Sequence, residues 1–121
     1  MLVVDDNLAA ARSLGDLLAL LGHQVTIAHD GPTALALSLQ APPELVLVDI
    51  GLPGMDGYAL VAALRQAGLE RVALIAVTGY GRDEDFARSR AAGFDHHLVK
   101  PVDLAALQRI TTEIKIGADR H

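Results

Sequence analysis

The stretch that most constrains the fold is an apolar run that ends in a carboxylate. Residues 45–48 read Leu-Val-Leu-Val and lead directly into Asp49, after which glycine and proline interrupt the chain. Consecutive apolar residues without polar alternation are typical of a strand buried on both faces of a parallel sheet. Asp49 would then lie at the carboxyl end of that strand, the edge at which ligands bind in open α/β sheets.

The composition supports one globular domain and argues against several functions. The chain has 121 residues, 51% of them hydrophobic, which is enough for a core. A net charge of −5 and an aromatic content of 3% disfavour binding to nucleic acid, because phosphates are repelled and stacking side chains are few. Cysteine is absent, which fits a cytoplasmic location, and no apolar run has the length of a membrane span. We expect no contact of this domain with nucleic acid or membrane.

Short apolar runs alternate with helical periodicities along the whole chain. The strands are expected at 2–4, 25–27, 45–49, 73–77 and 97–99. The helices are expected between them: one ending at Gly22, one between Asp30 and Pro42, one ending at Gly68, one at 83–92, and one that Asp103 caps. Leucines supply most of the predicted apolar stripes, including Leu35 and Leu39 in the second helix and Leu104, Leu107, Ile110 and Ile114 in the last.

This alternation predicts an α/β fold, with a parallel sheet covered by helices on both faces. Two strand orders suit a domain of this size: the dinucleotide-binding order and the flavodoxin-like order 2-1-3-4-5. In the second order Asp5, Asp6 and Asp49 converge across one strand spacing of about 4.8 Å. We assign residues 1–116 to a single domain and residues 117–121 to a tail.

Three carboxylates in one cleft repel one another, so they require a proton or a cation. An oxygen-only ligand set favours a hard ion such as Mg²⁺, or Mn²⁺ in its place. The simpler alternative is that Asp5, Asp6 and Asn7 only cap the first helix.

Two further polar residues end neighbouring strands. Lys100 follows the fifth strand, and its long side chain could reach Asp49 or a bound phosphoryl oxygen, while Thr78 ends the fourth strand with a hydroxyl. A carboxylate held between a divalent cation and an ammonium group can act as a nucleophile toward phosphorus. The sequence has no P-loop and no GxGxxG motif, so a bound nucleotide is not the obvious phosphoryl donor.

Four segments, in this order and spacing, resemble the receiver domain of two-component response regulators. They are Val3-Val4-Asp5-Asp6-Asn7, the stretch 45–57, Thr78-Gly79 and Lys100-Pro101. The resemblance implies the flavodoxin-like (βα)5 fold and a phosphoryl group transferred to Asp49 from a phosphohistidine of a histidine kinase or a histidine phosphotransfer domain. It also implies that Asp5, Asp6, Asp49 and the Gly51 carbonyl hold Mg²⁺, and that Lys100 and Thr78 contact the phosphoryl group.

The same resemblance implies a switch. Thr78 would move toward the phosphoryl oxygen, and the change would be read on the face formed by the fourth helix, the fifth strand and the fifth helix. That face is also a candidate for pairing two copies of the chain. His97 stands where the family usually carries tyrosine or phenylalanine, so it is either a modified switch residue or a surface histidine.

Several alternatives stay open at this point. The domain could stand alone or belong to a hybrid sensor histidine kinase, which the phrase Gly93-Phe94-Asp95-His96-His97 resembles. A phosphoacceptor would not be an enzyme beyond slow self-dephosphorylation. The rivals are an aspartyl-phosphate phosphatase, a flavin-binding module on the same fold, and a degenerate receiver that acts only by binding partners.

Overall fold

The computed structural model describes residues 1–50, 57–69, 71–78, 83–100 and 102–119. Its strands are β1 (Leu2–Val4), β2 (Thr26–Ala28), β3 (Leu45–Asp49), β4 (Ala73–Thr78) and β5 (His96–Val99). Its helices are α1 (Leu8–Leu20), α2 (Gly31–Gln40), α3 (Gly57–Gln66), α4 (Asp83–Ala92) and α5 (Leu104–Asp119). Strands and helices alternate throughout, as the sequence predicts.

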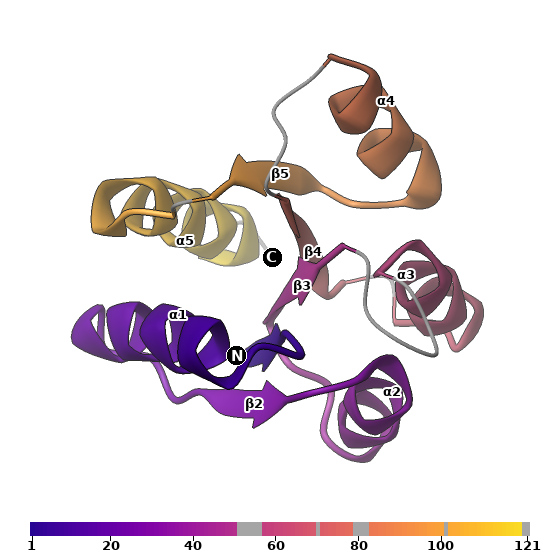
Figure 1. Cartoon of the computed structure of the whole chain (residues 1–121), viewed down its shortest axis with the longest axis horizontal. Helices are drawn as coiled ribbons and strands as arrows, with labels where there is room; N and C mark the ends of the chain where they lie inside the picture. Colours follow the sequence, from indigo (N-terminus) through magenta and orange to yellow (C-terminus); the bar gives the residue numbers. More distant parts are fainter. Residues whose placement is uncertain (51–56, 70, 79–82, 101, 120–121) are drawn as a thin grey trace.

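The strands form one parallel sheet in the order β2-β1-β3-β4-β5. This is the flavodoxin-like order that the resemblance to receiver domains predicts, so that prediction is confirmed, and the dinucleotide-binding order is excluded. Helices α1 and α5 cover one face of the sheet, and α2, α3 and α4 lie on the other (Figure 1). Strand β3 therefore lies at the centre, and β2 and β5 form the two edges.

Strand β3 is buried on both faces, which explains its unbroken apolar run. Residues 45–48 are each at most 1% exposed. Val46 and Val48 belong to the core on the side of α2 and α3, with Leu60, Val61 and Leu64. Leu45 and Leu47 belong to the opposite core, with Leu14, Leu18 and Leu107. Because successive side chains of a strand point to opposite faces of the sheet, this one segment contributes to both aliphatic cores.

Side-chain caps fix where three helices begin. Asn7 accepts a hydrogen bond from the Ala10 N–H at 3.0 Å at the start of α1. Asp30 and Asp103 do the same for α2 and α5, at 2.7 and 2.8 Å. Among the described residues the side-chain cap of α1 is Asn7, so neither Asp5 nor Asp6 is the capping residue.

Two of the predicted apolar stripes are wrong in part. Leu39 is 52% exposed, and α2 buries the small residues Ala34 and Ser38 instead, so its stripe is shifted by one position. Small side chains let α2 approach the sheet closely, and Leu35 and Leu37 beside them are partly buried against the same core. Leu104, at the first position of α5, is 38% exposed, whereas Leu107 and Ile110 are buried as predicted.

Smaller differences concern element ends. Strand β5 begins at His96, β2 covers Thr26–Ala28, and α5 continues to Asp119, beyond residue 116 where we place the end of the domain. Among the described residues, no helix combines the length and apolar character needed to cross a membrane.

Comparing a buried leucine of α3 with an exposed leucine of α2 tests this description of the core. Leu64 on α3 is 1% exposed, so Leu64→Ala should lower the free energy of unfolding by about 2–5 kcal/mol. The matched change Leu39→Ala should cost less than about 0.5 kcal/mol, because that side chain is already in water. Urea denaturation followed by circular dichroism measures both. Equal losses for the two variants would contradict this packing.

Candidate functional site

The site begins where β1 ends. Asp5 directly follows Val4, and its backbone N–H still bonds to the Ala28 carbonyl at 3.1 Å, which keeps it at the sheet edge. Its Oδ1 accepts the N–H of Asn7 at 2.9 Å. The residue is 0% exposed, and its Oδ2 has no hydrogen-bond partner in the described part of the chain. A buried carboxylate oxygen without such a partner is costly unless a cation is close.

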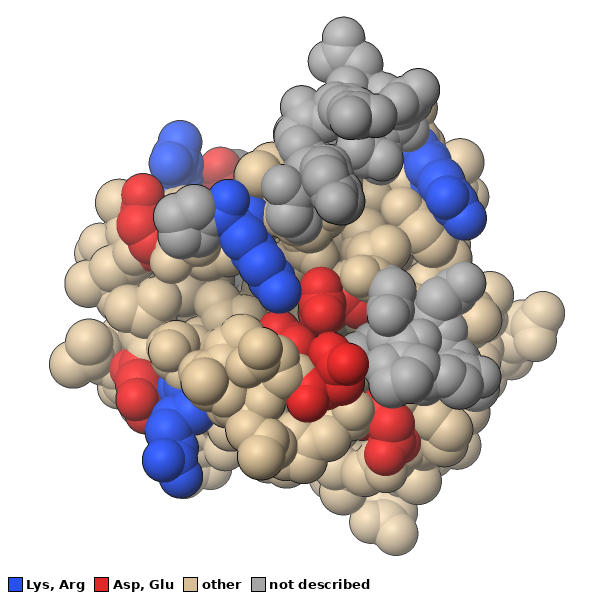
Figure 2. Space-filling model, in the orientation of Figure 1, with Lys and Arg blue, Asp and Glu red and all other residues tan. Residues whose placement is uncertain are grey.

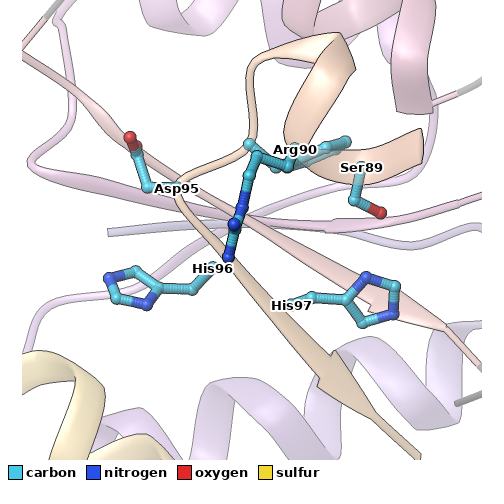
Figure 3. Close-up of a pocket in the computed structure, with 6 residues that line it drawn as sticks. Ser89, Arg90, Asp95, His96 and His97 are labelled. Carbon is cyan, nitrogen blue, oxygen red and sulfur yellow. The ribbon is translucent and has the colours of Figure 1, made fainter. Parts of the chain in front are cut away.

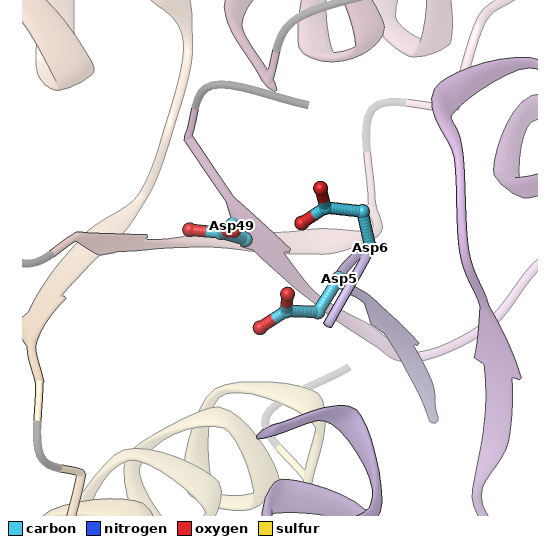
Figure 4. A group of neighbouring side chains, drawn as sticks. All are labelled: Asp5, Asp6 and Asp49. Carbon is cyan, nitrogen blue, oxygen red and sulfur yellow. The ribbon is translucent and has the colours of Figure 1, made fainter. Parts of the chain in front are cut away.

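Strand pairing brings two more carboxylates to the same place. Val4 of β1 is paired with Val48 of β3, so the residues that follow them, Asp5 and Asp49, lie side by side at this edge of the sheet. One carboxylate oxygen from each of Asp5, Asp6 and Asp49 lies within 4.8 Å of the others (Figure 4). Asp5 is buried, Asp49 is half-buried and Asp6 is exposed, so the cluster opens to solvent on one side.

Lys100 supplies the cation that faces this cluster. Its Nζ lies 3.5 Å from Asp5 Oδ2 and 3.5 Å from Asp49 Oδ1. Its backbone N–H donates to the Thr78 carbonyl at 2.7 Å, which fixes where the side chain leaves the sheet. Figure 2 shows the acidic side chains gathered in the middle of this face, with a basic side chain reaching their edge. One ammonium group therefore balances only part of the negative charge.

The electrostatics of Asp49 follow from this crowding. Burial raises the pKa of Asp49 above its usual value of 3.8, and the negative charge of Asp5 raises that pKa further. The ammonium group of Lys100 acts in the opposite direction but does not cancel these effects. The ionised form of Asp49 is thus less stable in this site than it would be in water, and an added cation would stabilise it.

The remaining predicted site residues have different outcomes. Thr78 is 7% exposed and ends β4 at the same edge, one residue beyond Val77, which pairs with Asp49. Gly51, the expected carbonyl ligand, lies outside the described residues, as does Pro101. His97 lies on β5, on the far side of β4 from Asp49: it is paired with Ala76, the residue before Val77, which pairs with Asp49.

The rings of His96 and His97 extend to opposite sides of β5 (Figure 3). Alternation along a strand predicts this, and it makes the adjacent pair a poor metal site. A pocket between α4 and β5 is lined by His96, His97, Ser89, Arg90, Phe94 and Asp95. Within it, the Ser89 hydroxyl is buried and makes no hydrogen bond to a described residue.

His29 is a contact that the sequence analysis does not predict. It follows β2, and its Nδ1 lies 3.4 Å from the backbone carbonyl of Asp5. At this length the contact is weak. Its position in the sequence could have indicated this contact, because a polar residue directly after a strand comes to the same sheet edge as Asp5 and Asp49.

Comparison with known proteins shows to which family the chain belongs. The family model of the response regulator receiver domain matches residues 1–112. The chain therefore belongs to the response regulator receiver family. In this receiver domain, five acidic, basic and hydroxyl residues lie at one edge of the sheet: Asp5, Asp6, Asp49, Thr78 and Lys100.

Individual relatives agree with the assignment. The receiver domain is 39% identical over 109 residues to the sensor histidine kinase RcsC of Salmonella typhi, covering 90% of this chain and 11% of that protein. A CheY-like receiver domain from Methylobacillus flagellatus is 34% identical, with a TM-score of 0.85 and coverage of 93% and 95% of the two chains.

A third match is the signal receiver domain of a histidine kinase from Syntrophus aciditrophicus. It is 28% identical, with a TM-score of 0.88 and coverage of 99% and 92%. The receiver domain described here thus matches solved receiver domains over nearly their whole length, but spans only about a tenth of the RcsC sequences.

The donor set of the acidic cluster fits a hard divalent cation. It offers only carboxylate oxygens, one of which, Asp5 Oδ2, is buried without a hydrogen bond to a described residue. Mg²⁺ prefers such oxygen ligands and retains several waters, which the open side next to Asp6 can accommodate.

The raised pKa of Asp49 predicts how stability depends on pH. Since the folded state holds the proton of Asp49 more tightly than the unfolded chain, stability falls as the pH rises from 3.8 through the raised pKa. In buffer with a chelator, Asp49→Asn should therefore have a higher Tm than the parent at pH 7, and this advantage should shrink at pH 4. Scanning calorimetry at both values measures it.

The control is Asp16→Asn, which changes an exposed aspartate on α1. Its Tm difference from the parent should be small at both pH values. A lower Tm for Asp49→Asn than for the parent at pH 7 would contradict the assigned direction.

Proposed function

We propose that Asp49 is the phosphoacceptor of a phosphorelay, and that its donor is a phosphohistidine on a histidine kinase or a histidine phosphotransfer domain. The observation that carries the proposal is the position of Lys100 Nζ, 3.5 Å from both Asp49 and Asp5. An ammonium group in that place neutralises charge on the acceptor carboxylate and on an incoming phosphoryl group alike. Family membership supports the same assignment.

In the proposed reaction an Asp49 carboxylate oxygen attacks phosphorus. The phosphorus–oxygen bond forms as the phosphorus–nitrogen bond to the donor histidine breaks, and the donor nitrogen keeps the electron pair. Lys100 stabilises the charge on the phosphoryl oxygens, and Thr78 is placed at the same edge to donate its hydroxyl. Asp5, Asp6 and Asp49, with the Gly51 carbonyl, would hold Mg²⁺ or Mn²⁺, which supplies further charge neutralisation when bound.

The proposed output is a change in the face formed by α4, β5 and α5. The Lys100 N–H bond to the Thr78 carbonyl couples the site directly to β5. His97 lies on that strand, three residues before Lys100, where the family usually has an aromatic residue. We propose His97 as the switch residue and the same face as a surface through which two copies could pair.

The wider setting is also a proposal. Similarity to sensor histidine kinases favours a receiver within a hybrid kinase, and the cysteine-free composition fits the cytoplasm. The domain would act as a signalling phosphoacceptor that loses its phosphoryl group slowly. Neither the phosphatase nor the flavin alternative receives support from the family match.

Phosphorylation by a small donor tests the assignment. Incubation with acetyl phosphate and Mg²⁺ should add one phosphoryl group, detected by intact-protein mass spectrometry, because the site itself holds the groups that promote transfer. Asp49→Asn should gain none, and Asp16→Asn should behave like the parent. Omission of divalent metal should slow labelling strongly. Equal labelling of the Asp49→Asn variant would exclude Asp49 as the acceptor.

The role of His97 is tested separately. Addition of beryllofluoride, which mimics a phosphoryl group, should change the amide chemical shifts of β5 and α4 in the parent. His97→Tyr, the usual family residue, should preserve these remote changes, whereas His97→Ala should reduce them while shifts near Asp49 still change. Identical remote changes in all three proteins would show that His97 takes no part in the switch.

A further inference from the structure

At the opposite end of the strands, one residue, Asp95, bonds to both backbone hydrogen-bonding groups of a single residue in the neighbouring strand. Asp95 directly precedes β5, and its Oδ2 accepts the N–H of Leu74 in β4 at 2.8 Å. Its own backbone N–H donates to the carbonyl of the same Leu74 at 2.7 Å. Asp95 therefore clamps a single residue of β4, and this clamp can form in only one register of β5.

Strand β5 needs such a clamp because its packing specifies register weakly. It is an edge strand of four residues, His96–Val99, and none of them is fully buried. In β3, by contrast, burial of 45–48 on both faces makes any slip costly. A short edge strand with little difference between its two faces can shift along its neighbour at low cost.

A second residue holds the clamp in place. Arg65, at the end of α3, donates to Asp95 Oδ2 at 3.1 Å and to the Gly93 carbonyl at 3.2 Å. It also donates to the carbonyls of Leu69 and Val72, at 2.9 and 3.1 Å, in the segment that leads into β4. One guanidinium group thus joins the chain entering β4 to the chain entering β5.

Register matters here because β5 carries Lys100 to the site. Slipping by one residue would move Lys100 by about 3.3 Å along the strand, close to the whole of its distance from Asp49. The same slip would turn His97 from one face of the sheet to the other. Figure 3 shows Asp95 and the two histidines in sequence along this strand.

We propose that Asp95, held by Arg65, is a positioning residue for phosphoryl transfer: it fixes the register of β5 and thereby places Lys100 beside Asp49. The consequence for the reaction rests on the proposed function, but the register itself can be measured without phosphorylation. The bond to Leu74 carries most of the effect, since the Asp95–Arg65 pair is partly exposed, with side chains 46% and 25% accessible, and is screened by water.

The test compares two variants with a matched control. Asp95→Ala removes both side-chain bonds, whereas Asp95→Asn keeps an oxygen that can accept the Leu74 N–H. The control Asp30→Ala removes a carboxylate that likewise accepts one backbone N–H, at 2.7 Å, but caps α2 next to β2, the edge strand farthest from β5. Nuclear Overhauser effects between β4 and β5 report the register, in which Ile75 faces His96.

In Asp95→Ala we expect these cross-strand effects to weaken or to be joined by those of a second register. Its rate of labelling by acetyl phosphate should fall at least about ten-fold, as expected for a misplaced charged group. Its affinity for Mg²⁺ should not fall, because the carboxylates follow β1 and β3. Asp95→Asn and Asp30→Ala should keep the parent register and rate.

Native cross-strand effects and a parent-like rate in Asp95→Ala would overturn the proposal. So would an equal loss of rate in Asp30→Ala, because the effect would then be one of stability alone. Failure of the parent itself to accept a phosphoryl group would instead contradict the proposed function, while the cross-strand measurements would still decide whether Asp95 sets the register.

Discussion

The ammonium group of Lys100 lies equally close to two carboxylates that repel one another. The charge arrangement at this sheet edge depends on its attraction to both, which offsets part of their repulsion. Asp5 and Asp49 are adjacent because β1 and β3 are paired, not because their charges favour it. The core that buries 45–48 supplies the free energy that holds them together. The result is a carboxylate with a raised pKa and a cluster that gains stability from a cation, which are the properties expected of a phosphoacceptor.

Much of the fold follows from the sequence because its strongest signals are local. The apolar runs, the glycines and prolines that end them and the caps at Asp30 and Asp103 all act within a few residues. The stripe of α2 does not follow from them, because residues such as Ala34 and Ser38 are buried by close approach of the helix to the sheet rather than by hydrophobicity. Strand order did not follow from local pattern either; the resemblance to receiver domains predicted the order 2-1-3-4-5, and the structure confirms it.

The site was predictable for a topological reason. Residues that directly follow parallel strands meet at one edge, so Asp5, Asp49, Thr78 and Lys100 could be brought together without knowledge of their contacts. The links of Asp95 to Arg65 and Leu74 could not, since Asp95 lies 30 and 21 positions from them and none of the three marks a strand end at the site. Local pattern cannot show that a carboxylate at the amino end of β5 aligns a lysine at its carboxyl end.

Chemical mapping of the modified residue tests the central claim most directly. After reaction with acetyl phosphate and Mg²⁺, borohydride converts an aspartyl phosphate to homoserine, and peptide sequencing by mass spectrometry locates it. The account predicts homoserine at position 49 alone, with Asp5 and Asp6 unmodified. Homoserine at position 5 or 6, or none at all in protein that has gained a phosphoryl group, would contradict it.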